Sequence, residues 1–593
     1  MISVHVPAMT ARQDVRAVSA TISDVPGVQI LQADLATRTV QVTGPVDPAA
    51  VTAAVSAAGY AVAPATDGSL RTGTTRTGGR PVDTFFSTDT TGLPEATHSQ
   101  VLDLADGDQV QLSLAPVAKR LAGTTVRMLA YNGSIPGPTL RVRQGSEITV
   151  HVTNDTDLET TVHWHGLRLD SSQDGVPGMT QASIPPGGAF TYRLPFVDAG
   201  LFWYHPHVRE DYTQEMGLYG TVLVEPAEPD YWPPAHRDVV LTLDDVLLED
   251  GAIAPFSRTQ TDYAAMGRYG NLLLVAGETA LTLTAKTGEV MRLWLVNTAN
   301  SRVFRVALPG ARMKLVGGDN GRVEHEQFVD DVTLAPSERA VVDVLVDRAG
   351  EYVLLHRTPE HTDRLAVITV TEHAAQPPLA AAFEQLRSAP ELAAEREQLD
   401  RWLAAPPDKT LAITAQMDMG DHMDMGDHMD MGDHMDMDDH MDMGHDMSGK
   451  QDDAGDGIEW EDHMVAMNRA MTSATMHWQL LDRTAGQDAP PTDWRFAVGD
   501  RVKLRVVNER DSDHPMHHPF HIHGAGRFLV LARDGAPEPD LVWKDTVLIP
   551  TGQAVDLLFD VTHPGRWMAH CHIAEHMHSG MVFTFTVTPA ATS

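Results

Sequence analysis

Three segments of this 593-residue chain repeat one plan, and the repeat limits the folds that the chain can adopt. Each segment has a glycine turn, then alternating apolar and polar residues, then Val-Thr or Val-Asn; they are residues 141–155, 285–299 and 496–510. Alternation with a period of two is typical of a half-buried strand, and a plan that recurs along a chain indicates repeated structural units. We therefore expect a mainly β protein with three β-sandwich domains, at residues 98–227, 236–373 and 408–589.

Residues 1–63 follow a different pattern, in which strand-like and helix-like stretches alternate. Their order predicts a small α+β domain of the ferredoxin-like βαββαβ type, and it resembles the heavy-metal-associated domain family. The metal loop of that family reads Met-Thr-Cys-x-x-Cys, whereas here Met9 and Thr10 are followed by Ala11 and Asp14 at the cysteine positions. Because thiolates hold soft Cu(I), we expect this degenerate domain to bind metal weakly or not at all. Its role would instead be to dock a partner, such as a copper chaperone, or would be purely structural.

Three further segments connect or interrupt these domains. Residues 64–97 are rich in Gly, Thr and Pro and indicate a linker, and residues 374–407 have the composition of a helical linker. Residues 417–447 repeat with a six-residue period and contain 11 Met, 5 His and 11 Asp, with no Lys or Arg. An acidic spacer needs no methionine, and thioethers suit Cu(I) or Ag(I). We expect this insert to lack fixed structure without a ligand and to hold additional labile Cu(I) or Cu(II).

Charge and composition exclude several classes of protein. The formal net charge is −37, which would repel the phosphates of nucleic acids and attract cations. No run of 18 apolar residues exists, so the sequence predicts no membrane span. A single cysteine, Cys571, excludes an internal disulfide.

Five His-x-His pairs stand out from this background. Residues i and i+2 of a strand face the same side, so each pair can present two imidazoles to one place. A single pair is more often structural, but four pairs in Trp-, Phe- or Pro-rich strand contexts indicate metal binding. The pairs are His163/His165, His205/His207, His521/His523, His570/His572 and His576/His578.

Cys571 lies between two of these histidines. On a strand its thiol points away from His570 and His572, so one segment can serve two metal sites. Cys571, His576 and the distant His518, with Met581 as a weak axial ligand, would form the ligand set of blue copper. We therefore expect the thiol to link a copper site to a second group of coppers.

Four motifs together resemble the copper-binding motifs of three-domain multicopper oxidases, which include laccases and bacterial cuprous oxidases. They are HWHG (163–166), WYHPH (203–207), HPFHIHG (518–524) and HCHIAEHMHSGM (570–581). The resemblance covers residues 98–589 and implies three cupredoxin-like Greek-key sandwiches holding four coppers. By the resemblance, the ligands are His518, Cys571, His576 and Met581 for type 1 copper, His163 and His521 for type 2, and two type 3 sets, His165, His205 and His572, and His207, His523 and His570.

The activity implied is one-electron oxidation of a reductant at type 1 copper, repeated four times, with O₂ reduced to water at the other three coppers. Asp174 matches a carboxylate near type 2 copper in the family and could relay protons, although an Asp-Gly turn is an equally good explanation. Many relatives carry a second relay glutamate directly after the last type 1 histidine. That position is Met577 here, and Glu575 precedes the histidine and is expected to face elsewhere.

The methionine insert indicates Cu(I) as the reductant, and so does Met516. Cuprous oxidases use a methionine at that position for substrate copper, and we expect His514 or Asp513 to assist it. The alternatives are a laccase-like oxidase of small phenols and a copper-sequestering protein without activity. The family is usually exported to the cell envelope or secreted, but the sequence as given shows no signal peptide, so a cytoplasmic location stays open.

Overall fold

The computed structural model divides the chain into two compact units, residues 1–83 and 84–593. The described residues are 2–8, 18, 21–22, 25, 30–34, 38–43, 46–62, 85–418, 456–484, 486 and 488–590. The metal-loop positions 9–14 and the insert beyond residue 418 lie outside them, so the predictions for these two segments stay predictions. Within the described residues, the helices are too short or too polar to cross a membrane.

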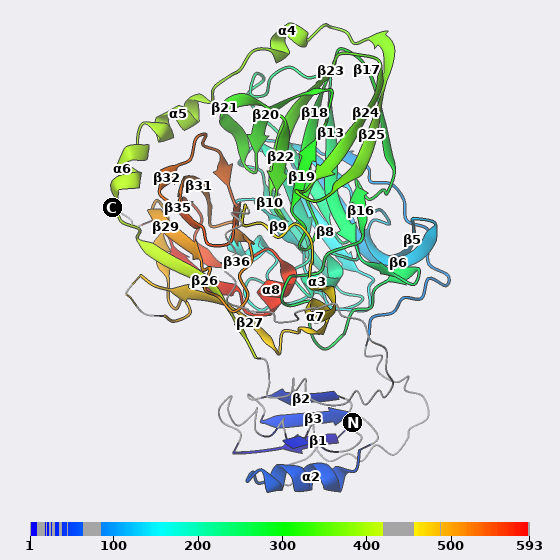
Figure 1. The fold of residues 1–593 in the computed structure, drawn as a ribbon, viewed down its shortest axis with the longest axis vertical. Helices are drawn as coiled ribbons and strands as arrows, with labels where there is room; N and C mark the ends of the chain where they lie inside the picture. The colour runs from blue at the N-terminus through cyan, green and yellow to red at the C-terminus, as the bar shows by residue number, and fades with distance from the viewer. Residues whose placement is uncertain are drawn as a thin grey trace, which may run out of the picture. The chain divides into compact units, whose positions relative to one another are not determined.

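The first unit contains an antiparallel sheet of order β1-β3-β2 and helix α2 (Figure 1). Their bounds are β1 (Ile2–His5), β2 (Ile30–Asp34), β3 (Thr39–Thr43) and α2 (Pro48–Ala57). The α2 helix begins where the Asp47 side chain accepts a hydrogen bond from the Ala49 N–H, with Pro48 in the first turn. Val51 and Val55 lie one helical turn apart and belong to the apolar core of this unit.

The second unit begins with a sandwich of two sheets, β10-β8-β5-β6 and β4-β7-β12-β11-β9. Its strands are β4 (Val101–Asp103), β5 (Gln109–Leu121), β6 (Thr124–Tyr131), β7 (Thr139–Arg143), β8 (Glu147–Asn154), β9 (His163–His165), β10 (Ala189–Pro195), β11 (Gly200–His205) and β12 (Gly220–Glu225). Two short helices accompany them, η1 (Ser171–Gln173) and α3 (Glu210–Thr213).

The second sandwich pairs the sheets β16-β13-β18-β23-β20-β21 and β17-β25-β24-β19-β22, with a small hairpin of β14 and β15. Its strands are β13 (Arg237–Val246), β14 (Leu248–Glu249), β15 (Ala252–Ile253), β16 (Leu272–Val275), β17 (Leu281–Thr287), β18 (Glu289–Asn297), β19 (Phe304–Ala307), β20 (Arg312–Gly318), β21 (Gly321–Val329), β22 (Asp331–Leu334), β23 (Arg339–Val346), β24 (Gly350–Arg357) and β25 (Thr362–Ala374).

Three helices, α4 (Ala380–Phe383), α5 (Pro390–Arg396) and α6 (Leu399–Ala404), then run along the outside of the molecule toward the third sandwich (Figure 1). That sandwich pairs β27-β26-β29-β35-β31-β32, with β33 beside β31, and β28-β37-β36-β30-β34. Its elements are β26 (Lys409–Met417), α7 (Val465–Ala470), β27 (Met476–Asp482), β28 (Arg495–Ala497), β29 (Arg501–Asn508), β30 (His518–Ile522), β31 (Gly526–Arg533), β32 (Ala536–Pro537), β33 (Trp543–Lys544), β34 (Thr546–Ile549), β35 (Ala554–Val561), β36 (Gly565–Cys571), α8 (Ala574–His578) and β37 (Val582–Thr588).

The three repeated segments occupy equivalent strands, β8, β18 and β29. Each pairs in parallel with the first long strand of its sandwich and antiparallel with another strand: β5 and β10, β13 and β23, β26 and β35. The prediction of a mainly β fold with internal repetition is therefore confirmed. The exact domain boundaries stay predictions.

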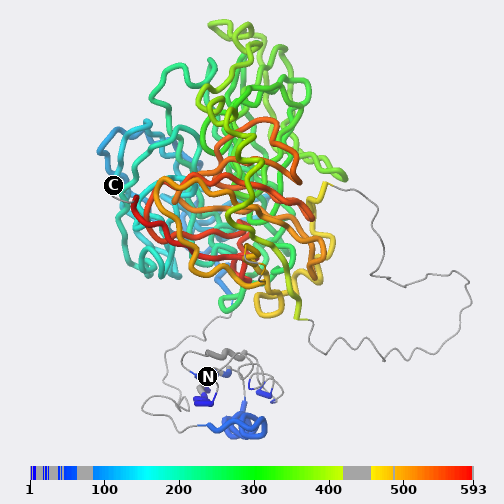
Figure 2. Tube along the Cα trace, turned by 90° about the vertical axis from the view of Figure 1, so that its left-hand side faces the viewer, coloured from blue at the N-terminus to red at the C-terminus, as the bar shows by residue number. Residues whose placement is uncertain are grey.

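The first and third sandwiches share one apolar core, which also takes in residues of the second such as Trp294 and Val341, whereas the rest of the second sandwich packs around a core of its own. Trp164 and Trp203 of the first sandwich and Trp478 and Trp567 of the third are all fully buried in the shared core. Figure 2 shows the strands of the third sandwich, in orange and red, against those of the first, in cyan. Any site built from motifs at both ends of the second unit must therefore lie at this junction.

Candidate metal centres

Four of the histidine pairs lie on or directly after four strands that meet at the junction, with His207, His523 and His572 just past the strand ends. In the first sandwich, β9 and β11 are neighbours and place His163 opposite His205. In the third, β30 and β36 are neighbours and place His521 opposite His570. Because alternate residues of a strand share a face, each sandwich directs four imidazoles toward the other.

These eight imidazoles form one buried cluster, called here the histidine cluster. Within each of three groups, one ring nitrogen per residue lies within 4.8 Å of the others. The groups are His163, His165 and His521; His165, His205 and His572; and His207, His523 and His570. The His523 Nε2 atom is 3.3 Å from His207 Nε2 and 3.0 Å from His570 Nε2.

One nitrogen of most of these rings is held from outside the cluster. His163 donates to the Asp174 carbonyl oxygen at 2.7 Å and His521 to that of Asp545 at 2.9 Å. His205 and His570 donate in the same way to the carbonyl oxygens of Pro206, at 2.9 Å, and Cys571, at 2.8 Å. These bonds fix the tautomer and leave the second nitrogen as a bare acceptor that can bind a metal.

The inward nitrogens have no hydrogen-bond partner although they are buried. They are His163 Nε2, His165 Nδ1, His205 Nε2, His521 Nε2 and His572 Nε2. An unsatisfied buried polar atom costs about 1–3 kcal/mol, and copper is a Lewis acid that imidazole nitrogens bind well. The cluster therefore fits a group of copper ions.

Burial also sets the protonation state of the cluster. It lowers the pKa of the His205 and His521 imidazoles well below the usual range, and it lowers the pKa of His570 to about 3. In His163 burial is the largest influence and acts in the same direction, but the charge and hydrogen bonds of Asp174, together with the charge of Glu210, outweigh it and raise the pKa. Neutral imidazole is the form that binds metal.

A second group lies on the other face of β36 and contains His518, Cys571 and His576, called here the Cys571 group. The Cys571 Sγ atom is 3.7 Å from His518 Nδ1 and 3.8 Å from His576 Nδ1, and the two nitrogens are 3.3 Å apart. Met581 is fully buried and its backbone oxygen accepts from the Cys571 N–H at 3.1 Å. Burial raises the pKa of the Cys571 thiol, so it would ionise only with a cation beside it.

Carboxylates that sequence reasoning missed orient several of the histidines. Asp545 Oδ1 lies 3.0 Å from His165 Nε2, and Arg339 of the second sandwich donates to the same carboxylate at 2.7 Å. A Cβ atom at Gly166 would lie 2.5 Å from Asp545 Oδ2, which explains the glycine of HWHG. Glu210 of α3 lies 2.5 Å from His207 Nδ1. Asp545 and Glu210 carry no motif of their own, so only their distances identify them.

The residues that the sequence placed at or next to possible proton-relay positions have different surroundings. Asp174 lies inside the site, where its Oδ2 accepts from His523 Nδ1 at 2.7 Å. Met577 is 8% exposed. Glu575 is buried, and burial raises its pKa well above the usual range. His578, the second member of the fifth pair, lies 3.7 Å from Asp211 and outside the groups described above.

The residues expected to bind substrate copper lie on the segment before β30. Met516 is fully buried in the shared core. His514 is half-buried, and its Nε2 lies 3.1 Å from the sulfur of Met266 in the second sandwich. Asp513 accepts from the Met417 N–H at 3.0 Å, at the end of β26. The structure thus brings His514 beside a thioether.

The Cys571 group is covered by an indole and a loop. The Trp478 ring lies 4.7 Å from the ring of His518 and 4.3 Å from that of His576. Its Nε1 donates to the Ala264 carbonyl oxygen at 2.8 Å, and His576 Nε2 donates to that of Ala265 at 3.0 Å. His518 is 1% exposed and His576 is fully buried.

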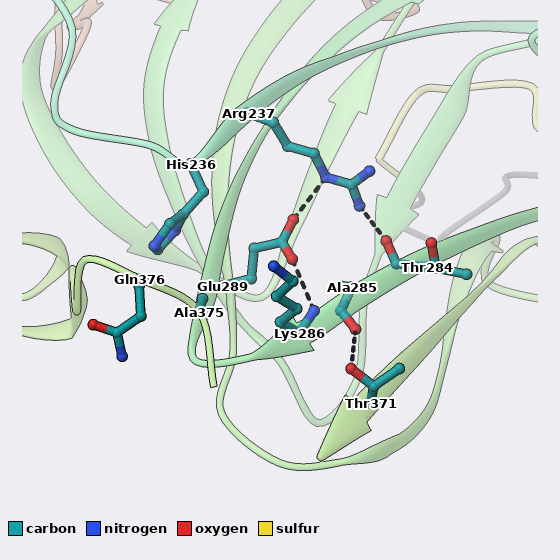
Figure 3. Close-up of a pocket in the computed structure, with 9 residues that line it drawn as sticks. All are labelled: His236, Arg237, Thr284, Ala285, Lys286, Glu289, Thr371, Ala375 and Gln376. Atoms are coloured by element: carbon teal, nitrogen blue, oxygen red, sulfur yellow. Dashed lines mark hydrogen bonds and ion pairs between the residues drawn. The ribbon is translucent and has the colours of Figure 1, made fainter. Parts of the chain in front are cut away.

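A pocket of about 460 Å³ opens on the second sandwich and takes no part in either metal group (Figure 3). Two of its charged groups pair with each other, since Arg237 contacts Glu289 at 2.7 Å, and Arg237 also donates to the Thr284 carbonyl oxygen. His236 donates to the Pro377 carbonyl oxygen at 2.8 Å and accepts from a backbone N–H.

Family comparisons agree with this geometry. Three family models described as multicopper oxidase match residues 115–229, 229–375 and 462–591, and a heavy-metal-associated domain model matches residues 3–61. The multicopper oxidase MmcO of Mycobacterium tuberculosis is 28% identical over 506 residues, which cover 80% of this chain and 86% of that protein. A copper resistance protein A homolog of Pseudomonas syringae pv. tomato is 26% identical over 574 residues, which cover 81% and 92%.

Solved structures show the same fold. A multicopper oxidase from Pseudomonas thermotolerans aligns with a TM-score of 0.58 and 25% identity, covering 83% of this chain and all of that one. The laccase-like multicopper oxidase CueO from an Ochrobactrum species aligns with a TM-score of 0.61 and 21% identity, covering 83% and 100%. The cupredoxin-like fold and the N-terminal domain predicted from sequence are confirmed. The chain belongs to the multicopper oxidase family and is a copper-dependent oxidoreductase with an N-terminal heavy-metal-associated domain.

Proposed function

We propose that this protein is a cuprous oxidase, which oxidises four Cu(I) ions for each O₂ reduced to two waters and consumes four protons. Multicopper oxidases use O₂ and a reduced substrate, and relatives named as copper resistance proteins support copper as that substrate. The excess of 81 acidic over 44 basic residues favours a cationic substrate.

The geometry supports four resident coppers. Type 1 copper would be held by the Cys571 group with Met581, and type 2 copper by His163 and His521. The type 3 coppers would be held by His165, His205 and His572, and by His207, His523 and His570. When bound, these coppers supply one-electron transfer and the four-electron reduction of O₂ to water.

The chain contributes the connection and the orientation. Cys571 is covalently joined to His570 and His572, so one peptide segment links the Cys571 group to the histidine cluster. Asp174, Asp545 and Glu210 hold histidines from outside, and burial keeps water from the inward nitrogens. Asp174 is also a candidate proton relay, because its carboxylate touches a cluster histidine.

The cover over the Cys571 group is the observation that carries the choice of substrate. His518 and His576 lie beneath Trp478 and residues 264–266, so a bulky phenol cannot contact either imidazole directly. Beyond the cover stand an imidazole and a thioether, His514 and Met266. These groups favour a soft metal ion over an aromatic ring.

A laccase-like phenol oxidase is the alternative, and the likeness to an oxidase described as laccase-like favours it. Steady-state O₂ uptake by the copper-loaded protein distinguishes the two, with Cu(I) and a phenol as competing reductants. We expect fast, saturable uptake with Cu(I) and slow uptake with the phenol. Uptake with the phenol alone would reject the cuprous oxidase proposal. The absence of uptake with either would instead favour a sequestering protein.

A further inference from the structure

Residues 456–462, called here the bridging segment, lie between the second and the third sandwich. Arg305 of β19 donates to the Asp456 carboxylate at 3.1 Å, and its guanidinium lies 4.4 Å from the centre of the Trp460 ring. Trp460 is 6% exposed and shares a small apolar core with Leu548 of β34. The bridging segment is therefore packed against both sandwiches.

The backbone of Glu459, within this segment, makes a hydrogen bond to each sandwich. Its N–H donates to His517 Nδ1 at 3.0 Å, and its carbonyl oxygen accepts from the Tyr269 hydroxyl at 2.9 Å. His517 is fully buried, and burial lowers its pKa to about 3 although the charge of Asp456 opposes it, so the imidazole is neutral and can accept. One residue thus connects the second sandwich to His517, which directly precedes His518 of the Cys571 group.

The two imidazoles of the Cys571 group are oriented in different ways. His576 Nε2 donates to the Ala265 carbonyl oxygen at 3.0 Å, whereas His518 Nε2 has no hydrogen-bond partner among the described residues. A histidine that binds metal is usually oriented by a hydrogen bond from its other nitrogen. The ring of His518 must instead be oriented by its own backbone and by packing against Trp478, whose ring lies 4.7 Å away.

The backbone around His518 is fixed on both sides. Pro519 follows it, and a residue before proline is restricted to extended conformations. On the other side, Asn508 donates to the Met516 carbonyl oxygen at 2.7 Å. Between Met516 and His518, the tie to the bridging segment is the hydrogen bond of the His517 side chain.

We propose that His517 is a positioning residue for type 1 copper, through which the bridging segment and the second sandwich set the orientation of His518. This inference rests on the assignment of type 1 copper to the Cys571 group under the proposed function, but not on the identity of the reductant. His517 carries neither electron nor proton in this role, and it acts only through the backbone next to it. Because either class of reductant delivers its electrons to type 1 copper, loss of the contact should slow both reactions equally.

Spectra and kinetics of His517→Leu in the full, copper-loaded protein test this assignment. Leucine leaves the Glu459 N–H without its acceptor. We expect the visible absorption of the Cys571 thiolate to weaken and the reduction potential of type 1 copper to shift. We also expect kcat with Cu(I) and with a phenol to fall by one common factor of at least about ten, the lower end of what loss of an outer contact costs a metal site. The copper of the histidine cluster should be retained.

Three further variants separate positioning from general damage to the fold. His517→Asn keeps an acceptor near the place of Nδ1 and should restore the thiolate absorption and both rates. Tyr269→Phe removes the other hydrogen bond of Glu459 and should change the absorption in the same direction as His517→Leu. His236→Leu is the matched control, because His236 Nδ1 also accepts a backbone N–H, that of Val290 at 2.9 Å, within the second sandwich. It should leave the absorption and both rates unchanged.

The inference is wrong if His517→Leu keeps the thiolate absorption and the type 1 potential of the wild type, or if His236→Leu changes them as much. If His517→Leu does not fold, Tyr269→Phe decides in its place, and an unchanged absorption in that variant rejects the inference. A wild type that loads with copper but lacks the thiolate absorption would instead reject the type 1 assignment. A wild type that oxidises the phenol and not Cu(I) would reject the cuprous oxidase proposal alone.

Discussion

Asp545 connects a histidine of the first sandwich to an arginine of the second. Its Oδ1 atom lies 3.0 Å from His165 Nε2, and its carboxylate forms a buried ion pair with Arg339. Asp545→Asn should weaken copper binding by about 10- to 100-fold, because the amide no longer fixes the tautomer and orientation of His165. Copper per chain after dialysis against a graded chelator measures the loss.

Arg292 and Asp343 form a matched pair within the second sandwich, far in sequence from any histidine of the cluster. They are also buried, with Nε and Oδ1 2.8 Å apart. Breaking either buried pair should destabilise the fold by about 3–5 kcal/mol. Asp343→Asn should nevertheless retain its copper, and equal copper loss in both variants would refute a specific role for Asp545.

Glu215 gives a pH dependence at a single residue. Burial raises its pKa to about 8, from 4.5, and Arg268 offsets only part of this effect. The folded state therefore binds more protons than the unfolded state between these values, so stability falls as pH rises through that window. Glu215→Gln removes this ionisation. As pH rises between these two pKa values, the free energy of unfolding of the variant relative to the wild type should therefore increase by roughly 1.4 kcal/mol per pH unit. Thermal unfolding of both proteins from pH 5 to pH 8 tests this, and a constant difference would contradict it.

Elements differ in how well their contacts could be predicted from sequence. Strands β9 and β36 could be predicted together with their role, because His-x-His spacing in an alternating strand fixes the side to which both imidazoles point. The contact of Met266 with His514 could not, since 248 residues separate them and residues 261–270 have no periodic pattern. Asp545 likewise lies 380 residues from His165. Local periodicity specifies strands, whereas loop contacts between sandwiches depend on how the domains pack.

The methionine insert lies in the sequence between strands β26 and β27, which pair with each other. Strand β26 ends at Met417, which pairs with Met476 of β27, and the Asp418 N–H donates to the Thr475 carbonyl oxygen at 2.8 Å. Replacing residues 419–455 by a short Gly-Ser linker should therefore leave the copper of the histidine cluster and the Cys571 group, and the thiolate absorption, unchanged. We expect Cu(I) oxidation to fall and phenol oxidation to rise, both measured by O₂ uptake. Unchanged rates with both reductants would show that the insert does not serve the active site.

At the scale of the whole molecule, the histidine cluster is an interface between domains. Each of its three groups combines histidines from the first and the third sandwich. Between the sandwiches the inward nitrogens have no hydrogen-bond partner of their own. The unmetallated junction therefore carries an energetic cost that bound copper removes. Bound copper should therefore stabilise the contact between the first and the third sandwich.

Removing copper should consequently lower the unfolding temperature of the whole second unit. A ligand that binds only the folded state adds about 2.7 kcal/mol at a hundred times its Kd, and several coppers share this junction. Calorimetry of copper-loaded and chelated protein should show one transition moving to lower temperature, with the first and third sandwiches unfolding together in the loaded form. Reloading with copper is the control and should restore the original transition. An unfolding temperature that does not depend on copper would mean that the sandwiches hold together without it, and that the cluster is shaped by the fold alone.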